Sequence, residues 1–220
     1  MGLLFFLLIL ALFFPVLFYP LLVFVGLFLI FIPLKFTLDS FFNIFFIPGQ
    51  IYKIATNSRL RKNHALEHAT VNILEKEYGY RRLSGYATEE GFYIIGAGNV
   101  NYVLEAAHRG LQLMKNGQRE LAVHINCGTS RIVANFVSAI IFLLLLFTTG
   151  QLSIVNVIIA LLVSHLFSTF LGKAVQRRFT TLARVEELEI EQAYFEKKTS
   201  FLGSNNQRLF IKTKEIPFVE

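Results

Sequence analysis

Residues 132–172 read IVANFVSAIIFLLLLFTTGQLSIVNVIIALLVSHLFSTFLG, a run of 41 residues without Asp, Glu, Lys or Arg. A helix needs about 20 apolar residues to cross the hydrocarbon core of a bilayer. The run is therefore long enough for two crossings, and near its middle Thr148-Thr149-Gly150-Gln151 interrupts the apolar pattern. We predict a transmembrane helical hairpin, with spans over about residues 132–149 and 152–172.

A second uncharged stretch occupies residues 1–34 and is punctuated by Pro15, Pro20 and Pro33. It is longer than one untilted span requires, so we expect one kinked, tilted span followed by an interfacial segment at residues 41–47. Together they would form an N-terminal membrane region over residues 1–50. Two spans are the alternative, either as a hairpin that turns near residues 15–20 or with a second span over residues 21–47. Lys35 and Asp39 argue against that second span. The stretch lacks the basic start and small-residue cleavage site of a signal peptide.

The composition is that of an integral membrane protein, with 54% hydrophobic residues and 24 Phe. Basic residues follow or precede the apolar runs: Lys53, Arg59, Arg61, Lys62, Arg119, Arg131, Lys173, Arg177 and Arg178. By the positive-inside rule, the segments between and after the runs are cytoplasmic, in a bacterial inner membrane or its equivalent. The net charge of +6 suits anionic lipid head groups. The lipid bilayer is therefore the expected partner; no nucleic-acid motif is present, and the oligomeric state is left open.

We predict that the polar segment over residues 51–131 forms a small cytoplasmic α+β domain. Residues 59–78 have helical periodicity, and Gly79 is a natural stop. Strands are expected over residues 83–87 and 91–95, followed by a helix that Asn101 caps. Alternating apolar and polar residues over 121–127 predict a last strand with Cys127 on its apolar face. The order helix-strand-strand-helix-strand lets both helices cover one sheet face.

The remaining chain, residues 173–220, predicts a cytoplasmic tail. Apolar residues at helical spacing among glutamates indicate an amphipathic helix over residues 178–198 that continues from the last span. Residues 200–207 are a polar linker. Residues 209–219 have the composition of an edge strand, limited by Pro217. The chain has one cysteine, so no internal disulfide forms, which suits a reducing compartment.

The functional signal of the central domain is His64-Ala65-Leu66-Glu67-His68. Residues at i, i+3 and i+4 of a helix share one face, so the two imidazoles would lie one turn apart with Glu67 between them. This H-x-x-E-H order is the inverzincin pattern, in which two histidines bind a divalent metal and the glutamate acts as general base. Cys127, in Asn126-Cys127-Gly128-Thr129, supplies a third ligand. We expect one Zn²⁺ or Fe²⁺.

Further residues are weaker candidates for the site. Three neighbours offer hydrogen-bonding groups that would orient the ligands: Asn63, Asn126 and Thr129. Asn63 is equally readable as a helix cap, and Thr129 as a strand-end hydroxyl. His108 is expected on a solvated helix face, and His124 would point away from Cys127 on an alternating strand. His165 lies within a predicted span, where it has a functional role or joins two helices by a hydrogen bond.

The central segment resembles S-ribosylhomocysteine lyase, a soluble α+β enzyme of the inverzincin type. The residues that carry the likeness are His-x-Leu-Glu-His at 64–68, Gly91-Phe92-Tyr93 and Cys127-Gly128-Thr129. The resemblance covers residues 64–129. It implies that His64, His68 and Cys127 hold iron or zinc and that Glu67 is the acid–base group. The whole chain also resembles an uncharacterised bacterial membrane-protein family with the same two metal-site signatures.

One departure from the lyase pattern changes the expected reaction. The lyase has a second cysteine for proton transfer shortly before its Gly-Phe-Tyr strand, whereas this chain has Ser84 in that region. A serine hydroxyl does not ionise near neutral pH, so the same lyase reaction is not expected. The remaining groups suit a membrane-anchored metallohydrolase, a peptidase or amidase, with Glu67 as base. The alternative is a non-catalytic assembly or interaction factor, or a metal sensor, whose metal is structural or absent.

Overall fold

A computed structural model describes residues 15–199 and 205–216, together with Gly2, Phe5, Phe6, Ile9 and Leu12. The contacts divide the chain into two compact units. A helical unit combines Met1–Phe45 with Asn135–Leu166, and a mixed α/β unit combines Phe46–Ala134 with Phe167–Glu220.

Within residues 15–199, the helical unit contains parts of three helices: α2 (Pro15–Ala55), α5 (Gly128–Thr149) and α6 (Ile154–Val175). All three are long and apolar enough to cross a membrane. Helices α5 and α6 form the hairpin predicted for residues 132–172. In its core, the rings of Phe36 and Phe142 meet edge-on with centroids 4.9 Å apart, and Leu143, Val157 and Ala160 pack beside them.

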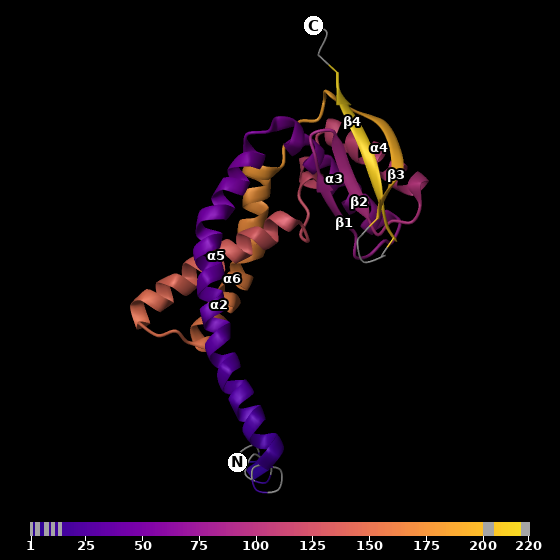
Figure 1. Cartoon of the computed structure of the whole chain (residues 1–220). Helices are drawn as coiled ribbons and strands as arrows, with labels where there is room; N and C mark the ends of the chain where they lie inside the picture. The colour runs from indigo at the N-terminus through magenta and orange to yellow at the C-terminus, as the bar shows by residue number, and fades with distance from the viewer. Residues whose placement is uncertain are drawn as a thin grey trace. The chain divides into compact units, whose positions relative to one another are not determined.

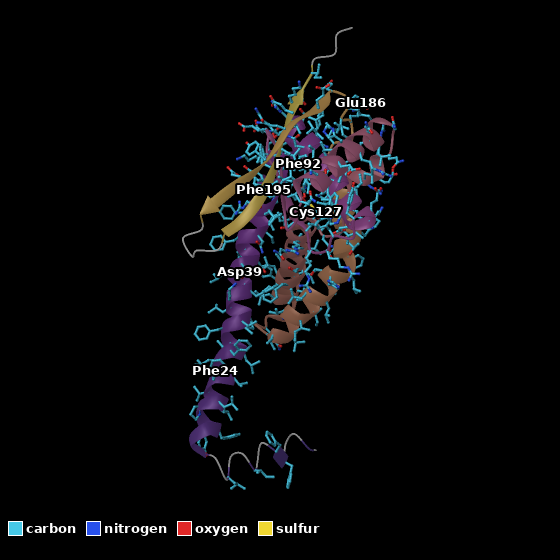
Figure 2. All side chains as sticks on the ribbon, turned by 90° about the vertical axis from the view of Figure 1, so that its right-hand side faces the viewer. Phe24, Asp39, Phe92, Cys127, Glu186 and Phe195 are labelled. Carbon is cyan, nitrogen blue, oxygen red and sulfur yellow. The ribbon has the colours of Figure 1, made fainter. Side chains whose placement is uncertain are left out.

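Most other apolar side chains on these helices are exposed. Phe24, for example, is 64% exposed and projects from α2 (Figure 2). At most 28% of the most apolar window of each helix is buried. Water would oppose so large an apolar surface, whereas lipid would not.

Helix α2 corrects the prediction for the N-terminal region. Residues 41–47 do not form a separate segment, because they continue the same helix from Pro15 to Ala55. Residues 15–20 are helical, so no hairpin turns there. Lys35 and Asp39 pair with each other one turn apart, which balances both charges without ending the helix. At 41 residues the helix is about 62 Å long, twice what one perpendicular crossing needs.

The mixed unit is a two-layer α/β sandwich. Its antiparallel sheet has the order β1 (Ser84–Ala87), β2 (Gly91–Ile95), β4 (Asn205–Glu215) and β3 (Leu188–Thr199). Helices α3 (Ser58–Glu77) and α4 (Val100–Lys115) cover one face of this sheet (Figure 1). The core between the layers contains Leu66, Leu74, Phe92, Ile94, Val103, Met114, Leu209 and Ile211.

Four predicted elements of this unit are confirmed. Helix α3 spans nearly the predicted residues and begins after Asn57, whose side-chain oxygen accepts from the amide of Leu60. Strands β1 and β2 lie where the turn pattern placed them. Helix α4 is also present, but its cap is Asn99 rather than Asn101, since Asn99 accepts from the amides of residues 101 and 102.

The predicted strand over residues 121–127 is wrong. Arg119–Ala122 form a 3₁₀ turn, η1, residues 123–127 form a loop, and α5 begins at Gly128. The alternating apolar and polar residues belong to a loop that packs against α3. Asn72 on α3 donates to the carbonyls of Leu121 and Val123, so these carbonyls are satisfied by a side chain instead of a neighbouring strand.

The predicted amphipathic helix over residues 178–198 is also wrong. A π-helical turn, η2 (Gln176–Thr180), ends α6, and the chain then becomes extended and enters β3. The expected edge strand in the tail is confirmed in part as β4, but it lies inside the sheet, between β2 and β3. Two of the four strands therefore come from the tail, and residues 51–131 supply only one half of the sheet.

Candidate metal centre

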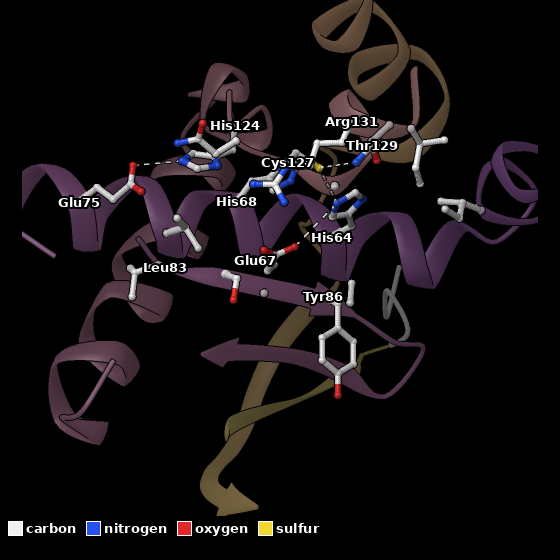
Figure 3. Close-up of a pocket in the computed structure, with 18 of the residues that line it drawn as sticks. His64, Glu67, His68, Glu75, Leu83, Tyr86, His124, Cys127, Thr129 and Arg131 are labelled. Atoms are coloured by element: carbon white, nitrogen blue, oxygen red, sulfur yellow. Dashed lines mark hydrogen bonds and ion pairs between the residues drawn. The ribbon is translucent and has the colours of Figure 1, made fainter. Parts of the chain in front are cut away.

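Helix α3 brings His64, Glu67 and His68 to one buried face, as their spacing predicts. The loop before α5 places Cys127 against the same face (Figure 3). Potential ligand atoms of His64, His68 and Cys127 all lie within 4.8 Å of one another. The Sγ atom of Cys127 is 3.4 Å from Nε2 of His64, and the two imidazole centroids are 4.4 Å apart.

Backbone carbonyls fix the orientation of both imidazoles. Nδ1 of His64 lies 2.9 Å from the carbonyl oxygen of Thr180, and Nδ1 of His68 lies 2.8 Å from that of Ala122. A carbonyl oxygen only accepts hydrogen bonds, so Nδ1 of each neutral ring carries the proton. The lone pair is then on Nε2. Metal-binding histidines are typically oriented by such a contact on their second nitrogen.

The Nε2 atom of His68 is buried and has no hydrogen-bond partner. Buried polar atoms are rarely left unpaired, and burial, together with the neighbouring His64, holds the pKa of His68 well below its usual value. The ring is therefore neutral, with a free lone pair beside a thiol and a second imidazole. A divalent cation bound by two nitrogens and one sulfur would satisfy this atom, so the residues fit the predicted metal.

Cys127 lies one residue before the first turn of α5. The amide N–H of Thr129 donates to its Sγ atom at 3.3 Å, and the exposed amides of a helix N-terminus favour negative charge. Burial raises the pKa of the Cys127 thiol, and the contacts with Thr129 oppose that rise. In these surroundings the Cys127 thiol is expected to lose its proton when a cation binds to the sulfur.

Glu67 is buried beside the two histidines. Its Oε2 atom is 3.7 Å from Nε2 of His64, and burial raises the pKa of its carboxyl group to about 8. Strand β1 passes close to this carboxyl group at Gly85. A Cβ atom at Gly85 would lie 2.5 Å from Oε1 of Glu67 and 2.6 Å from the carbonyl oxygen of Tyr93. A glycine at this position therefore leaves the space that the carboxyl group occupies.

Gly85→Ala is expected to displace Glu67 and destabilise the mixed unit by about 1–3 kcal/mol, the usual cost of overfilling a packed site. Hydrogen exchange of the β1 and β2 amides in the full-length protein measures this change. Gly98→Ala is the control, because a Cβ atom there meets nothing within 4 Å. Equal protection of the sheet in both variants would contradict the close approach of β1 to Glu67.

The four candidate site residues, His64, Glu67, His68 and Cys127, line a cavity of about 670 Å³. Its wall includes His124. The predicted strand would have pointed this side chain away from Cys127. The loop instead brings Nε2 of His124 to 3.1 Å from Oε2 of Glu75 and its ring centroid to 6.1 Å from that of His68 (Figure 3). Glu75 lies seven residues after His68, two helical turns along the same face. That spacing is the signal in the sequence that places Glu75 on the helix face of the candidate ligands.

The three predicted orienting residues have different surroundings. Thr129 contacts Cys127 as described. Asn126 lines the cavity with an exposed side chain. Asn63 donates to the carbonyls of Thr88 and Glu89 and accepts from the hydroxyl of Thr213. Its bonds therefore connect α3 to the β1–β2 turn and to β4, and none of them involves a candidate ligand.

One residue that holds the Cys127 loop was not predicted. The side-chain oxygen of Gln176 accepts from the amide of His124 at 3.0 Å, and its nitrogen donates to the carbonyl of the same residue at 3.1 Å. Gln176 is fully buried at the start of η2, and nothing in its local sequence marks it. Among the remaining histidines, His108 is exposed on α4, and His165 lies on α6; neither lines the cavity.

Comparison with known proteins places these residues in a family. The chain is 32% identical over 80 residues to an uncharacterized protein of Picosynechococcus sp., a match that covers 32% of this chain and 39% of that protein. No solved structure matches. A family model described as "Domain of unknown function (DUF6391)" matches residues 59–193, which is more than half of the chain and includes all the candidate ligands. The chain therefore belongs to the DUF6391 family.

Proposed function

We propose that the protein is a membrane-anchored metallohydrolase that acts on peptide or other amide bonds. His64, His68 and Cys127 would hold one Zn²⁺ or Fe²⁺, and Glu67 would act as general base. The observation that supports this proposal most is the set of three converging ligand atoms with the buried carboxyl group of Glu67 beside them. Their shared cavity of about 670 Å³ is in the size range of small-molecule sites.

The number and kind of ligands favour catalysis over a structural role. Structural zinc sites are usually closed by four protein ligands, whereas catalytic sites have three and leave one position open. Among the described residues, the metal-binding group consists of three side chains. A bound divalent ion would supply a Lewis acid that polarises a carbonyl group and acidifies water.

The other residues of the cavity have definable tasks. Beside a bound cation, the carboxyl group of Glu67 would ionise despite its raised pKa. It would then take a proton from the attacking water and pass it to the leaving nitrogen. The carbonyls of Ala122 and Thr180 hold both imidazoles in orientation. Arg131 lines the cavity and would attract a carboxylate or another anionic group of a substrate.

The likeness to S-ribosylhomocysteine lyase supports the metal site but not the lyase reaction. Ser84 lies on β1 and lines the cavity, in the region where the lyase has its second cysteine. A hydroxyl there is a poor proton carrier near neutral pH. We therefore keep hydrolysis as the proposed reaction.

Anchoring in a membrane is supported by α2, α5 and α6, whose apolar faces are mostly exposed. The basic residues beside these helices favour a cytoplasmic position for the mixed unit. The catalytic site would then act on substrates at the inner surface of the membrane.

Glu67→Gln is the test that separates a hydrolase from a structural metal site or a sensor. Metal content is measured by mass spectrometry on anaerobically purified full-length protein, and cleavage is measured on a casein-derived peptide mixture. We expect about one Zn or Fe per chain in both proteins, and cleavage that is about 10²–10⁴-fold slower in the variant.

Two results would contradict the proposal in different ways. Well-folded wild-type protein that binds no metal, even after reconstitution, would overturn the site itself. Metal binding with equal rates of peptide cleavage by wild type and Glu67→Gln would exclude the catalytic role of Glu67. Absence of cleavage in both would leave the assembly factor or sensor.

A further inference from the structure

A second cavity, of about 510 Å³, lies in the mixed unit beside the candidate metal centre. The η1 turn contributes Arg119, Glu120 and Ala122, and Val123 follows them. The rest of the wall consists of Arg177 in η2 and residues 181–184, which follow η2. Three arginines thus face one glutamate around the same space.

The guanidinium groups of these arginines are available to a ligand. Within the described residues, Arg119, Arg177 and Arg184 form no salt bridge and no side-chain hydrogen bond. All three side chains are exposed. Other basic side chains of the unit do have partners, such as Lys62, which pairs with Glu187 and Glu215. The wall of the cavity therefore has three positive charges against the one negative charge of Glu120. Glu187, which interacts electrostatically with Arg184, is not part of the wall.

Apart from Thr181, whose hydroxyl donates to the carbonyl of Gln176, the remaining wall is apolar. It consists of Ala122, Val123, Leu182 and Ala183. A ligand that fits must combine an anionic group with apolar surface. Arginine forks bind phosphate oxygens in pairs, and a glycerol backbone with the first carbons of an acyl chain would lie on the apolar wall. This combination is the chemistry of a phospholipid.

The position of the cavity along the chain agrees with such a ligand. Arg177 lies two residues after the end of α6, one of the three helices long enough to cross a membrane. A residue just beyond a spanning helix lies at the level of the lipid head groups. Basic pockets at the cytoplasmic ends of spanning helices are typical sites for anionic lipids.

We propose that this cavity binds the phosphate-bearing head group of an anionic phospholipid. The segments that line it also hold the candidate metal centre, because the carbonyl of Ala122 accepts from His68 and that of Thr180, next to Thr181, accepts from His64. A bound head group would therefore contact the two segments that orient both imidazoles. The proposal itself does not require a metal or a hydrolytic activity.

Native mass spectrometry of the full-length protein tests the proposal. Protein in detergent is mixed with equal amounts of phosphatidylglycerol and phosphatidylcholine, and the retained lipid is counted. The wild type is expected to retain phosphatidylglycerol at least about 10-fold more than phosphatidylcholine, since each basic residue near the head group adds substantially to binding. The triple variant Arg119→Gln/Arg177→Gln/Arg184→Gln is expected to lose this preference.

A charge-matched control replaces three arginines outside the cavity by glutamine: Arg81, Arg109 and Arg208. This variant should keep the lipid preference. Thermal unfolding checks that the variants are folded, and Arg184→Gln alone replaces the triple variant if the latter is not. Equal retention of both lipids by the wild type, or an equal loss of preference in both triple variants, would overturn the proposal. Release of the lipid by inorganic phosphate would assign the cavity to a soluble phosphate and overturn the lipid as its ligand.

Discussion

His68→Ala is expected to lower the affinity of the protein for Zn²⁺ by at least about 100-fold. Loss of an outer hydrogen-bond partner of a ligand alone typically costs 10–100-fold, and this change removes the ligand itself. Nε2 of His68 is also a buried atom without a hydrogen-bond partner, so a bound cation would supply the partner that it lacks. Competition with a chromophoric chelator, on full-length protein in detergent, measures the affinity.

His108→Ala is the matched control for that experiment. His108 is exposed on α4 and does not line the cavity, so its replacement should leave the affinity within about 2-fold of wild type. If His68→Ala binds Zn²⁺ as tightly as the control variant, the metal is bound elsewhere and the site described above is wrong. Hydrogen exchange of the α3 amides shows that the helix remains folded in both variants.

Ile211→Ala is expected to destabilise the mixed unit by about 2–5 kcal/mol, the usual cost of removing a large buried aliphatic side chain. Ile211 is fully buried and lies in β4, where it is opposite Phe92 of β2 and Ala193 of β3. Loss of its side chain leaves a cavity between the sheet and the helices. Hydrogen exchange of the β2 and β4 amides in the full-length protein reports the change in opening free energy.

Ile216→Ala provides the comparison, since Ile216 follows the end of β4 and is 39% exposed. Its effect should stay within about 0.5 kcal/mol. Similar exchange rates in the two variants would mean that β4 is not a central strand, and the tail would then not complete the sheet. A large effect of Ile211→Ala on β1 and β2 as well would show that the tail and the central segment unfold together.

The candidate site depends on this joint folding. His64 and His68 come from α3, Cys127 from the loop before α5, and the carbonyl that holds His64 from Thr180 in η2. Arg61 also connects α3 to the η2 region, because its guanidinium group donates to the carbonyls of Arg178 and Thr181. The site is thus assembled from three segments that are up to 116 residues apart in the chain.

Short-range patterns of the sequence determined much of this protein. The spacing of His64, Glu67 and His68 places them on one helical face whatever surrounds the helix, because helical periodicity is a property of the backbone. The uncharged runs determined the apolar helices α5 and α6, since their length and composition leave few alternatives. The turn around Glu90 and Gly91 predicted the pairing of β1 and β2 for the same local reason.

Only the tertiary structure decided the rest. Residues 178–198 have a pattern compatible with a helix, but the free edge of β2 accepts β4, and β4 in turn accepts β3; pairing over such distances has no local signal. Residues 121–127 alternate like a strand, yet Asn72 and Gln176 satisfy the backbone groups of this segment in a loop. That loop brings Cys127 to His64 and turns His124 into the cavity, because side chains remote in sequence replaced the hydrogen bonds of a neighbouring strand.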